Sequence, residues 1–197
     1  MPALPTPTVT DGLHEDRPNA IATLVAAFIS DPLMRWMFPE AHTYLTWFPE
    51  VLRHYAGASF DHGSAYRAAD GSGTALWMPP GVGPDEEALG QVVAQHVDEA
   101  IQEDLFALLE QVGASHPDEP HWFLPAIGVD PRAQATGVGS ALMAHALTTI
   151  DEHGAVAYLE STNLRNIPMY ERFGFSVVRQ LQVGASPTLT PMIRTAR

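Results

Sequence analysis

The chain contains no cysteine and no lysine among its 197 residues. The absence of cysteine excludes disulfides, thiolate metal sites and a cysteine nucleophile, which fits a cytoplasmic protein. The absence of lysine excludes a P-loop, whose phosphate-binding motif ends in Gly-Lys-Ser/Thr. No run of 18 apolar residues is present, and Met1–Thr10 lacks the basic, apolar pattern of a secretory signal. We therefore expect a cytoplasmic protein without a membrane span.

Basic residues are scarce. Ten arginines face 23 acidic residues, which gives a formal net charge of −13. A field of this sign repels phosphate groups, so we predict no nucleic-acid and no membrane partner. The same field is compatible with attraction of a cationic substrate, although excess acid also serves solubility.

The length fits one domain. Apolar residues make up 46% of the chain and charged residues 17%, which is typical of a globular protein. We predict a single domain over 1–197 with a loose tail at 1–7, a helical insertion at 84–113 and a cofactor-binding half at 121–197. No metal site is expected.

The first half of the sequence predicts short strands between helices. Asp16 is expected to cap the first helix, and Pro39 and Pro49 are expected to break a second helical region that ends near Phe60. After Pro84, apolar residues spaced by three and four predict an amphipathic helix or helix pair that ends near Gly113. The strands expected here are Val9–Leu13 and a hairpin of Ser64–Ala69 with Thr74–Pro79.

The last third alternates between strand and helix. A strand, a long helix and a second strand imply two parallel neighbours in one sheet. A short helix and an antiparallel pair of strands follow. The expected fold class is therefore α/β with a mixed sheet, and its C-terminal elements are His121–Val129, Thr136–Glu152, Ala155–Ser161, Ile167–Phe173, Phe175–Leu181 and Thr188–Ile193.

The stretch 128–140 joins a strand ending in Asp-Pro to a helix through a loop with two glycines. Glycines there let backbone N–H groups point into one concavity, and the helix N-terminus favours an anion. The loop is therefore predicted to hold phosphate. A dinucleotide-binding fold is an alternative, because Glu160 follows at about the right distance. Against it, Leu142 stands where the third glycine belongs, and fewer than 40 residues remain after Glu160.

Two sequence blocks resemble the GNAT superfamily of N-acetyltransferases. Gln134-x-x-Gly137-x-Gly139 resembles the family's acyl-CoA pyrophosphate loop. The block from Asn163 to Phe175, with Asn166, Tyr170 and Gly174-Phe175, is similar to a second family signature. Trp122-Phe123-Leu124 and Leu159-Glu160-Ser161 further resemble antibiotic-modifying members such as puromycin N-acetyltransferase.

This resemblance implies a GNAT fold, in which a mixed central sheet with splayed parallel strands is flanked by helices. It also implies transfer of an acetyl group from acetyl-CoA to a primary amine, most simply of a small molecule. Pro125 predicts a bulge in the main strand, because proline cannot donate to the ladder. The implied cofactor-binding residues are Ile127, Gly128 and Val129 for the pantetheine arm, Gln134, Ala135, Thr136, Gly137, Val138, Gly139 and Ser140 for the pyrophosphate, and Asn163 and Asn166.

The resemblance also implies two catalytic residues. Tyr170 matches the family's general acid, since a phenol with a pKa of about 10 can protonate a thiolate whose conjugate acid is near 8.5. Glu160 is the first choice for the base that takes the ammonium proton. His121 and a chain of water molecules remain alternatives. Asn163 and Asn166 can serve equally as caps of the short helix.

Other functions remain open from the sequence. One is acetylation of a protein N-terminus or lysine, which needs an open peptide groove. The insertion 84–113 favours a compact pocket instead. Another is a catalytically silent acyl-CoA-binding module. A homodimer also stays open.

Overall fold

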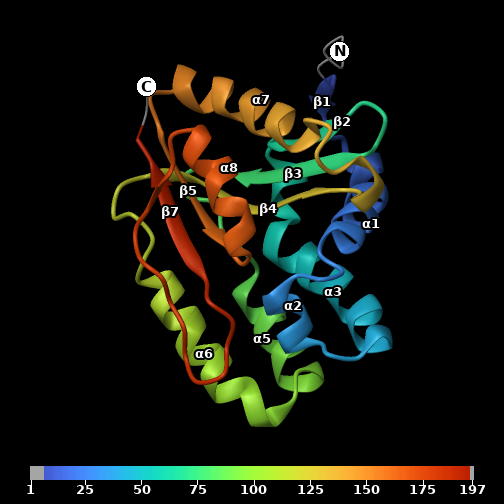
Figure 1. Ribbon diagram of the computed structural model, residues 1–197, viewed down its shortest axis with the longest axis vertical. Coiled ribbons are helices and arrows are strands. Elements are labelled where there is room, and N and C mark those ends of the chain that lie inside the picture. Colours follow the sequence, from blue (N-terminus) through green and yellow to red (C-terminus); the bar gives the residue numbers. More distant parts are fainter. Residues whose placement is uncertain (1–6, 196–197) are drawn as a thin grey trace.

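The computed structural model describes residues 7–195, which fold around one seven-stranded sheet in the order β1-β2-β3-β4-β5-β7-β6 (Figure 1). Neighbouring strands are antiparallel except β4 and β5, which are parallel as predicted. Residues 1–6 of the predicted tail lie outside the described residues. The strands are β1 (Val9–Asp11), β2 (Ala65–Ala68), β3 (Gly73–Met78), β4 (His121–Val129), β5 (Val156–Ser161), β6 (Ser176–Val177) and β7 (Thr190–Arg194).

Helices cover both faces of the sheet. The α-helices are α1 (Arg17–Ala27), α2 (Pro32–Met37), α3 (Ala41–Ala56), α4 (Ala58–Asp61), α5 (Glu86–His96), α6 (Glu99–Gly113), α7 (Val138–Glu152) and α8 (Ile167–Arg172). Three 3₁₀ turns, η1 (His14–Asp16), η2 (Pro131–Ala133) and η3 (Leu164–Asn166), precede α1, α7 and α8. The predicted insertion is thus the helix pair α5 and α6, and Asp85 caps its first turn by accepting from Ala88 N at 3.0 Å.

Two apolar cores lie on opposite faces of the sheet. One contains buried side chains of α1, α3, α5 and α6, and the other contains those of α7 and α8. Figure 1 shows where these helices lie around the sheet. Leu181 and Leu189, which pair with each other within the long connection from β6 to β7, belong to the first core. The connection therefore returns beside α6 and closes that face of the molecule.

The predicted bulge at Pro125 is confirmed. Leu76 of β3 pairs with Ala126 of β4, whereas Met78 pairs with Phe123, so three steps along β4 match two along β3. The extra residue falls beside Pro125, where no N–H is available for the ladder.

Strands β4 and β5 pair only at their N-terminal ends. Their parallel register runs from His121–Val156 to Leu124–Leu159, and beyond these pairs the described strands separate. The separation begins at the bulge, which turns β4 away from its neighbour. The carboxyl ends of two adjacent parallel strands thus face one another across an opening.

Two local predictions were wrong. Helix α3 runs from Ala41 to Ala56 through Pro49 without a break. Its buried face, which includes Tyr44, Phe48 and Leu52, packs into the first core and outweighs the cost of roughly 3 kcal/mol that an internal proline imposes. Asp16 makes no side-chain cap on α1; its carboxylate instead accepts from Leu13 N at 3.0 Å and closes η1.

Candidate active site

A small cavity of about 50 Å³ occupies the opening between the two parallel strands. We call this opening the β4–β5 gap. Phe28 and Pro125 contribute apolar surface, whereas Glu160 and Tyr170 contribute polar groups. The lining residues are Phe28, Leu124, Pro125, Ala126, Ile127, Leu159, Glu160, Ser161, Thr162, Asn166 and Tyr170.

Backbone groups of β4 point into the gap in alternation. Asp130 N donates to Ser72 O at 2.8 Å, so the groups two residues earlier, on Gly128, also face β3. The backbone N–H and C=O groups of Ile127 and Val129 point away from β3 and into the gap, where the pairing with β5 has ended. Gly128 has a packing role, because a Cβ there would lie 2.7 Å from Ala27 Cβ. The predicted trio is therefore divided, with two members facing the gap.

The predicted phosphate loop leads from β4 into α7. Ala135 and Gly137 have positive φ angles of 62° and 94°, and the left-handed turn at Gly137 ends where α7 begins. The first N–H groups of that helix, on Val138, Gly139 and Ser140, have no partner within it. The Val138 side chain is buried in the second core, so only its backbone is available to a ligand.

Side chains hold the loop in shape. Gln134 Nε2 donates to Val129 O at 3.2 Å, and Thr136 Oγ1 donates to Ala133 O at 2.6 Å. These contacts close the loop on the end of β4. The loop is thereby held against the same strand that forms one wall of the gap.

The second sequence block supplies the far side of the gap. Asn163 accepts from Arg165 N at 3.1 Å and caps η3, whereas Asn166 makes no side-chain cap and lines the gap. Tyr170 on α8 is 5% exposed and also lines the gap. Burial, with a smaller contribution from the charge of Asp31, raises the pKa of the Tyr170 phenol above its ordinary value.

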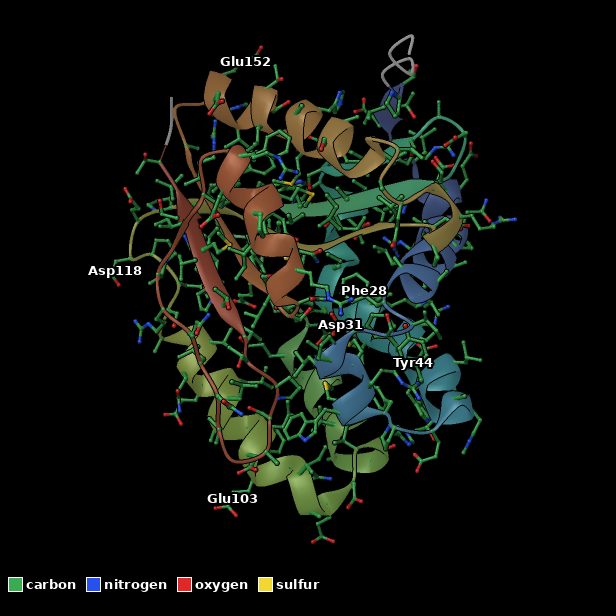
Figure 2. The ribbon with its side chains drawn as sticks, in the orientation of Figure 1. Phe28, Asp31, Tyr44, Glu103, Asp118 and Glu152 are labelled. Carbon is green, nitrogen blue, oxygen red and sulfur yellow. The ribbon has the colours of Figure 1, made fainter. Side chains whose placement is uncertain are left out.

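Asp31 fastens α2 to the end of β5. Its carboxylate accepts from Leu33 N at 3.0 Å and Met34 N at 3.1 Å, and also from the Thr162 hydroxyl. Phe28 and Tyr44 lie close to the same turn, and Figure 2 labels all three side chains. Burial raises the pKa of Asp31, and these hydrogen bonds offset part of that rise. The contact with Thr162 fixes one rim of the gap.

A second and much larger cavity, of about 740 Å³, lies under the predicted insertion. We call it the large cavity. Its size suits a ligand of small-molecule dimensions. Helices α5 and α6 form two of its walls, with apolar side chains of Leu89, Val93, Phe106, Leu109 and Val112. The segment 81–84 before α5, the segment between α6 and β4, and Tyr55, Phe123 and Glu160 complete the lining.

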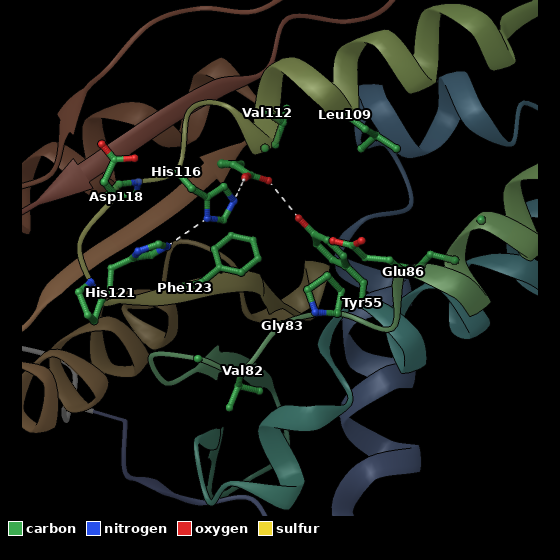
Figure 3. Close-up of a pocket in the computed structure, with 18 of the residues that line it drawn as sticks. Tyr55, Val82, Gly83, Glu86, Leu109, Val112, His116, Asp118, His121 and Phe123 are labelled. Carbon is green, nitrogen blue, oxygen red and sulfur yellow. Dashed lines mark hydrogen bonds and ion pairs between the residues drawn. The ribbon is translucent and has the colours of Figure 1, made fainter.

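Glu160 lines both cavities. It lies at the carboxyl end of β5, and its side chain is 7% exposed. Tyr55 Oη donates to its Oε2 at 3.0 Å, and His116 Nε2 lies 3.0 Å from its Oε1 (Figure 3). A carboxylate accepts about four hydrogen bonds, so Glu160 retains capacity for a further donor.

The large cavity is acidic. Four acids contribute to its lining, and neither arginine nor lysine is among its described lining residues. Burial and the neighbouring carboxylate of Glu160 raise the pKa of Tyr55 well above its ordinary value, so this phenol stays protonated. The four acids are Glu86, Asp118, Glu119 and Glu160.

The sequence-based prediction missed three residues of this region. His116 lies in a connection without a recognisable spacing. Tyr55 occupies a helix whose aromatic residues all resemble core positions. Asp31 precedes Pro32, and an Asp-Pro pair by itself is compatible with the end of one helix as well as with the start of the next. The pair could have predicted the start of α2, because Asp is a favoured N-cap residue and Pro is favoured at the first helical position.

Known proteins are similar to this chain in sequence and in fold. A model of the acetyltransferase (GNAT) family matches residues 40–175. An uncharacterized N-acetyltransferase of Schizosaccharomyces pombe is 28% identical over 175 residues, which cover 82% of this chain and 71% of that protein.

Solved structures share the architecture. A protein of Corynebacterium glutamicum described as histone acetyltransferase HPA2 and related acetyltransferase is 24% identical, with a TM-score of 0.69 over 98% of each chain. Arylalkylamine N-acetyltransferase 2 of Aedes aegypti is 14% identical, with a TM-score of 0.71 over 96% of this chain and 99% of the other. Within residues 7–195, no helix combines the length and apolarity needed to cross a membrane. Since the family match spans more than half of the sequence, the chain belongs to the acetyltransferase (GNAT) family and is an acyl-CoA-dependent acetyltransferase.

Proposed function

We propose that the chain transfers an acetyl group from acetyl-CoA to the primary amine of a small molecule bound in the large cavity. One observation carries this proposal: Glu160 lines both the β4–β5 gap and the large cavity. A carboxylate at this junction can take a proton from an amine in one compartment beside a thioester in the other.

The residues around the gap suit acetyl-CoA. The N-terminus of α7 offers backbone N–H groups to the pyrophosphate, and Ala135, Thr136 and Gly137 shape the loop beside it. Ile127 and Val129 present backbone groups to the pantetheine amides, and Asn166 lies at the far side. When bound, acetyl-CoA supplies an activated acetyl thioester. We retain Asn163 as a residue that positions the loop preceding α8.

The lining of the large cavity supports a cationic acceptor with an apolar body. Its acids favour an ammonium group, and its leucine, valine and phenylalanine side chains favour aromatic or aliphatic surface. Arylalkylamines have this chemistry. Aminonucleosides of the puromycin type have it too, and Trp122-Phe123-Leu124 and Leu159-Glu160-Ser161 resemble the sequences of acetyltransferases that modify such compounds. The two helices over the cavity favour such a ligand over a protein chain.

Three groups of the chain divide the chemistry. Glu160 accepts the ammonium proton, so that a neutral amine can attack. The backbone N–H of Val129 donates to the acetyl carbonyl oxygen as negative charge develops there. Tyr170 donates a hydrogen bond, and finally its proton, to the leaving sulfur. The raised pKa of Tyr170 keeps that proton in place until the sulfur becomes basic.

The proposal is tested by CoA release across a panel of acceptors. The panel contains arylalkylamines, puromycin and other aminonucleosides, aminoglycosides, polyamines, arylamines and short peptides. Because the chain has no cysteine, a thiol-reactive dye detects only the product. We expect release with apolar amines and little with peptides. Release with peptides alone would contradict the small-molecule assignment. Binding of acetyl-CoA without release from any acceptor would instead favour a silent binding module.

A further inference from the structure

A row of hydrogen bonds runs outward from Glu160. His116 Nε2 lies 3.0 Å from Glu160 Oε1, and His116 Nδ1 lies 3.0 Å from His121 Nε2. His121 Nδ1 lies 2.9 Å from the carbonyl oxygen of Glu119. We call Glu160, His116, His121 and that carbonyl the histidine row, and its first contacts are dashed in Figure 3.

The row has room for one extra proton. Each of its three contacts joins two heavy atoms and needs one proton between them. Two neutral imidazoles supply two protons, and an ionised carboxylate and a carbonyl supply none. The row is therefore completely hydrogen bonded when one additional proton resides on Glu160 or on an imidazole.

Exposure increases along the row. The side chain of Glu160 is 7% exposed and that of His116 is 30% exposed. The contact of His121 with Glu119 lies at the exposed end. Both histidines also line the large cavity. The row thus connects an enclosed carboxylate with solvent.

The proposed reaction produces a proton that must leave. An ammonium substrate R–NH₃⁺ and an acetyl thioester yield R–NH–acetyl, CoA thiol and one H⁺. The N–C bond forms and the C–S bond breaks. The nitrogen loses two protons: Glu160 takes the first, and the second replaces the proton that Tyr170 gives to sulfur. Glu160 must be deprotonated again before the next turnover.

We propose that His116 and His121 are positioning residues that orient Glu160 and conduct its proton to solvent. This inference rests on the proposed function. A proton that Glu160 takes from the ammonium enters the contact with His116. A proton then leaves His121 Nδ1 to water beyond Glu119. Neither histidine needs to touch the acceptor for this role.

The surroundings support this direction. Tyr55 holds the other oxygen of Glu160 but stays protonated, so it offers no exit. The ring of Tyr158 lies 4.3 Å from that of His116, and Phe123 lies 5.1 Å away, so both rings fix the imidazole. The charged residues near the row are Glu86, Asp118 and Glu119, which line the same cavity, and Arg179, whose charge acts on Tyr158.

The test is chemical rescue of His116→Ala. We expect kcat to fall about 10- to 100-fold, while KM for acetyl-CoA stays within about twofold. Added imidazole should enter the large cavity and raise kcat of the variant at least about tenfold. The pH dependence of this rescue should follow the fraction of imidazole that is unprotonated. Pyrazole has the same shape but little basicity and should not restore activity.

His121→Ala should show a smaller loss of kcat and the same pattern of rescue. His42→Ala, an exposed helical histidine, is the matched control.

Several outcomes would overturn the inference. Equal rescue by pyrazole would indicate that His116 only fills space. An unchanged kcat and pH profile in both variants would show that Glu160 exchanges its proton directly with water. If the wild type acetylates no acceptor, the proposed function fails separately, and NMR titration of the two imidazoles still tests the row. Coupled titration is expected, and independent titration would contradict it.

Discussion

Tyr170 combines a buried phenol with a place at the edge of the β4–β5 gap. Tyr170→Phe should keep the ring in its packing against Phe175 while removing the proton donor. We expect kcat to fall roughly 10²-fold and acetyl-CoA affinity to change less than about threefold. Because burial raises the pKa of Tyr170, its ionisation should not produce the alkaline limb of the wild-type pH profile.

Steady-state kinetics and a cofactor titration check this expectation. The variant should show the same alkaline limb as the wild type at a lower plateau. A turnover equal to that of the wild type with a good acceptor would remove Tyr170 from the catalytic assignment.

Gly137 carries the second residue-scale prediction. Its φ of 94° is unfavourable for other residues, at a cost of about 1–2 kcal/mol, although a Cβ there would meet no atom within 4 Å. Gly137→Glu places a carboxylate beside the N–H groups expected to bind the pyrophosphate. We expect loss of measurable acetyl-CoA binding by calorimetry.

Gly63→Glu is the matched control, because Gly63 has a φ of 62° and open surroundings in the turn before β2. It should share the backbone strain and keep cofactor affinity. Similar affinity in the wild type and Gly137→Glu would disprove the role assigned to the loop.

Asp31 shows how one side chain joins elements. It caps α2 and binds Thr162 at the end of β5, at the cost of a buried charge. A carboxyl whose pKa is higher in the folded state stabilises the fold below its unfolded pKa of about 3.9 and loses that contribution as pH rises through the folded value. Asp31 therefore contributes less to the stability of the fold at neutral pH, where it is ionised, than at pH 4.

We predict that Asp31→Asn gains stability relative to the wild type as pH rises from about 4 to 7. The amide oxygen can retain the cap, so Asp31→Asn should be about 1–2 kcal/mol more stable than Asp31→Ala at every pH, since neither variant side chain titrates. Denaturant unfolding of the three proteins at several pH values measures this. A difference between the wild type and Asp31→Asn that does not vary with pH, or that grows in the opposite direction, would contradict the burial argument.

The sequence revealed elements where local chemistry determines the backbone. Asp-Pro, two glycines and a periodic helix predicted the loop before α7, and Pro125 predicted the bulge in β4. Local chemistry misled at Pro49, because tertiary packing of α3 outweighs the preference of proline. His116 could not be predicted, since only the tertiary fold brings this connection to Glu160, 44 residues further along the chain.

The whole molecule carries a formal charge of −13, and the large cavity is lined by acids. Attraction of a cationic acceptor should weaken with salt, because the screening length falls from about 30 Å at 0.01 M to about 4–5 Å at 0.5 M. We expect kcat/KM for a cationic arylalkylamine to fall roughly 3- to 10-fold over this range. An arylamine that is uncharged at the assay pH is the control, since it shares the cofactor.

Initial rates at saturating acetyl-CoA measure the salt effect. The two acceptors should diverge as salt increases. Equal declines would indicate that salt acts on the cofactor or the fold instead of on the acceptor.

The limited pairing of β4 with β5 also has a mechanical consequence. Backbone pairing across the middle of the sheet is confined to the four pairs from His121–Val156 to Leu124–Leu159. The sheet thus consists of a four-stranded part, β1 to β4, and a three-stranded part, β5 to β7, which share only a short line of backbone pairing. We call this line the hinge, and side-chain packing also holds the two parts together. A ligand that hydrogen bonds to both edges would lengthen that hinge. The stiffness of the molecule across its centre therefore depends on what fills the gap.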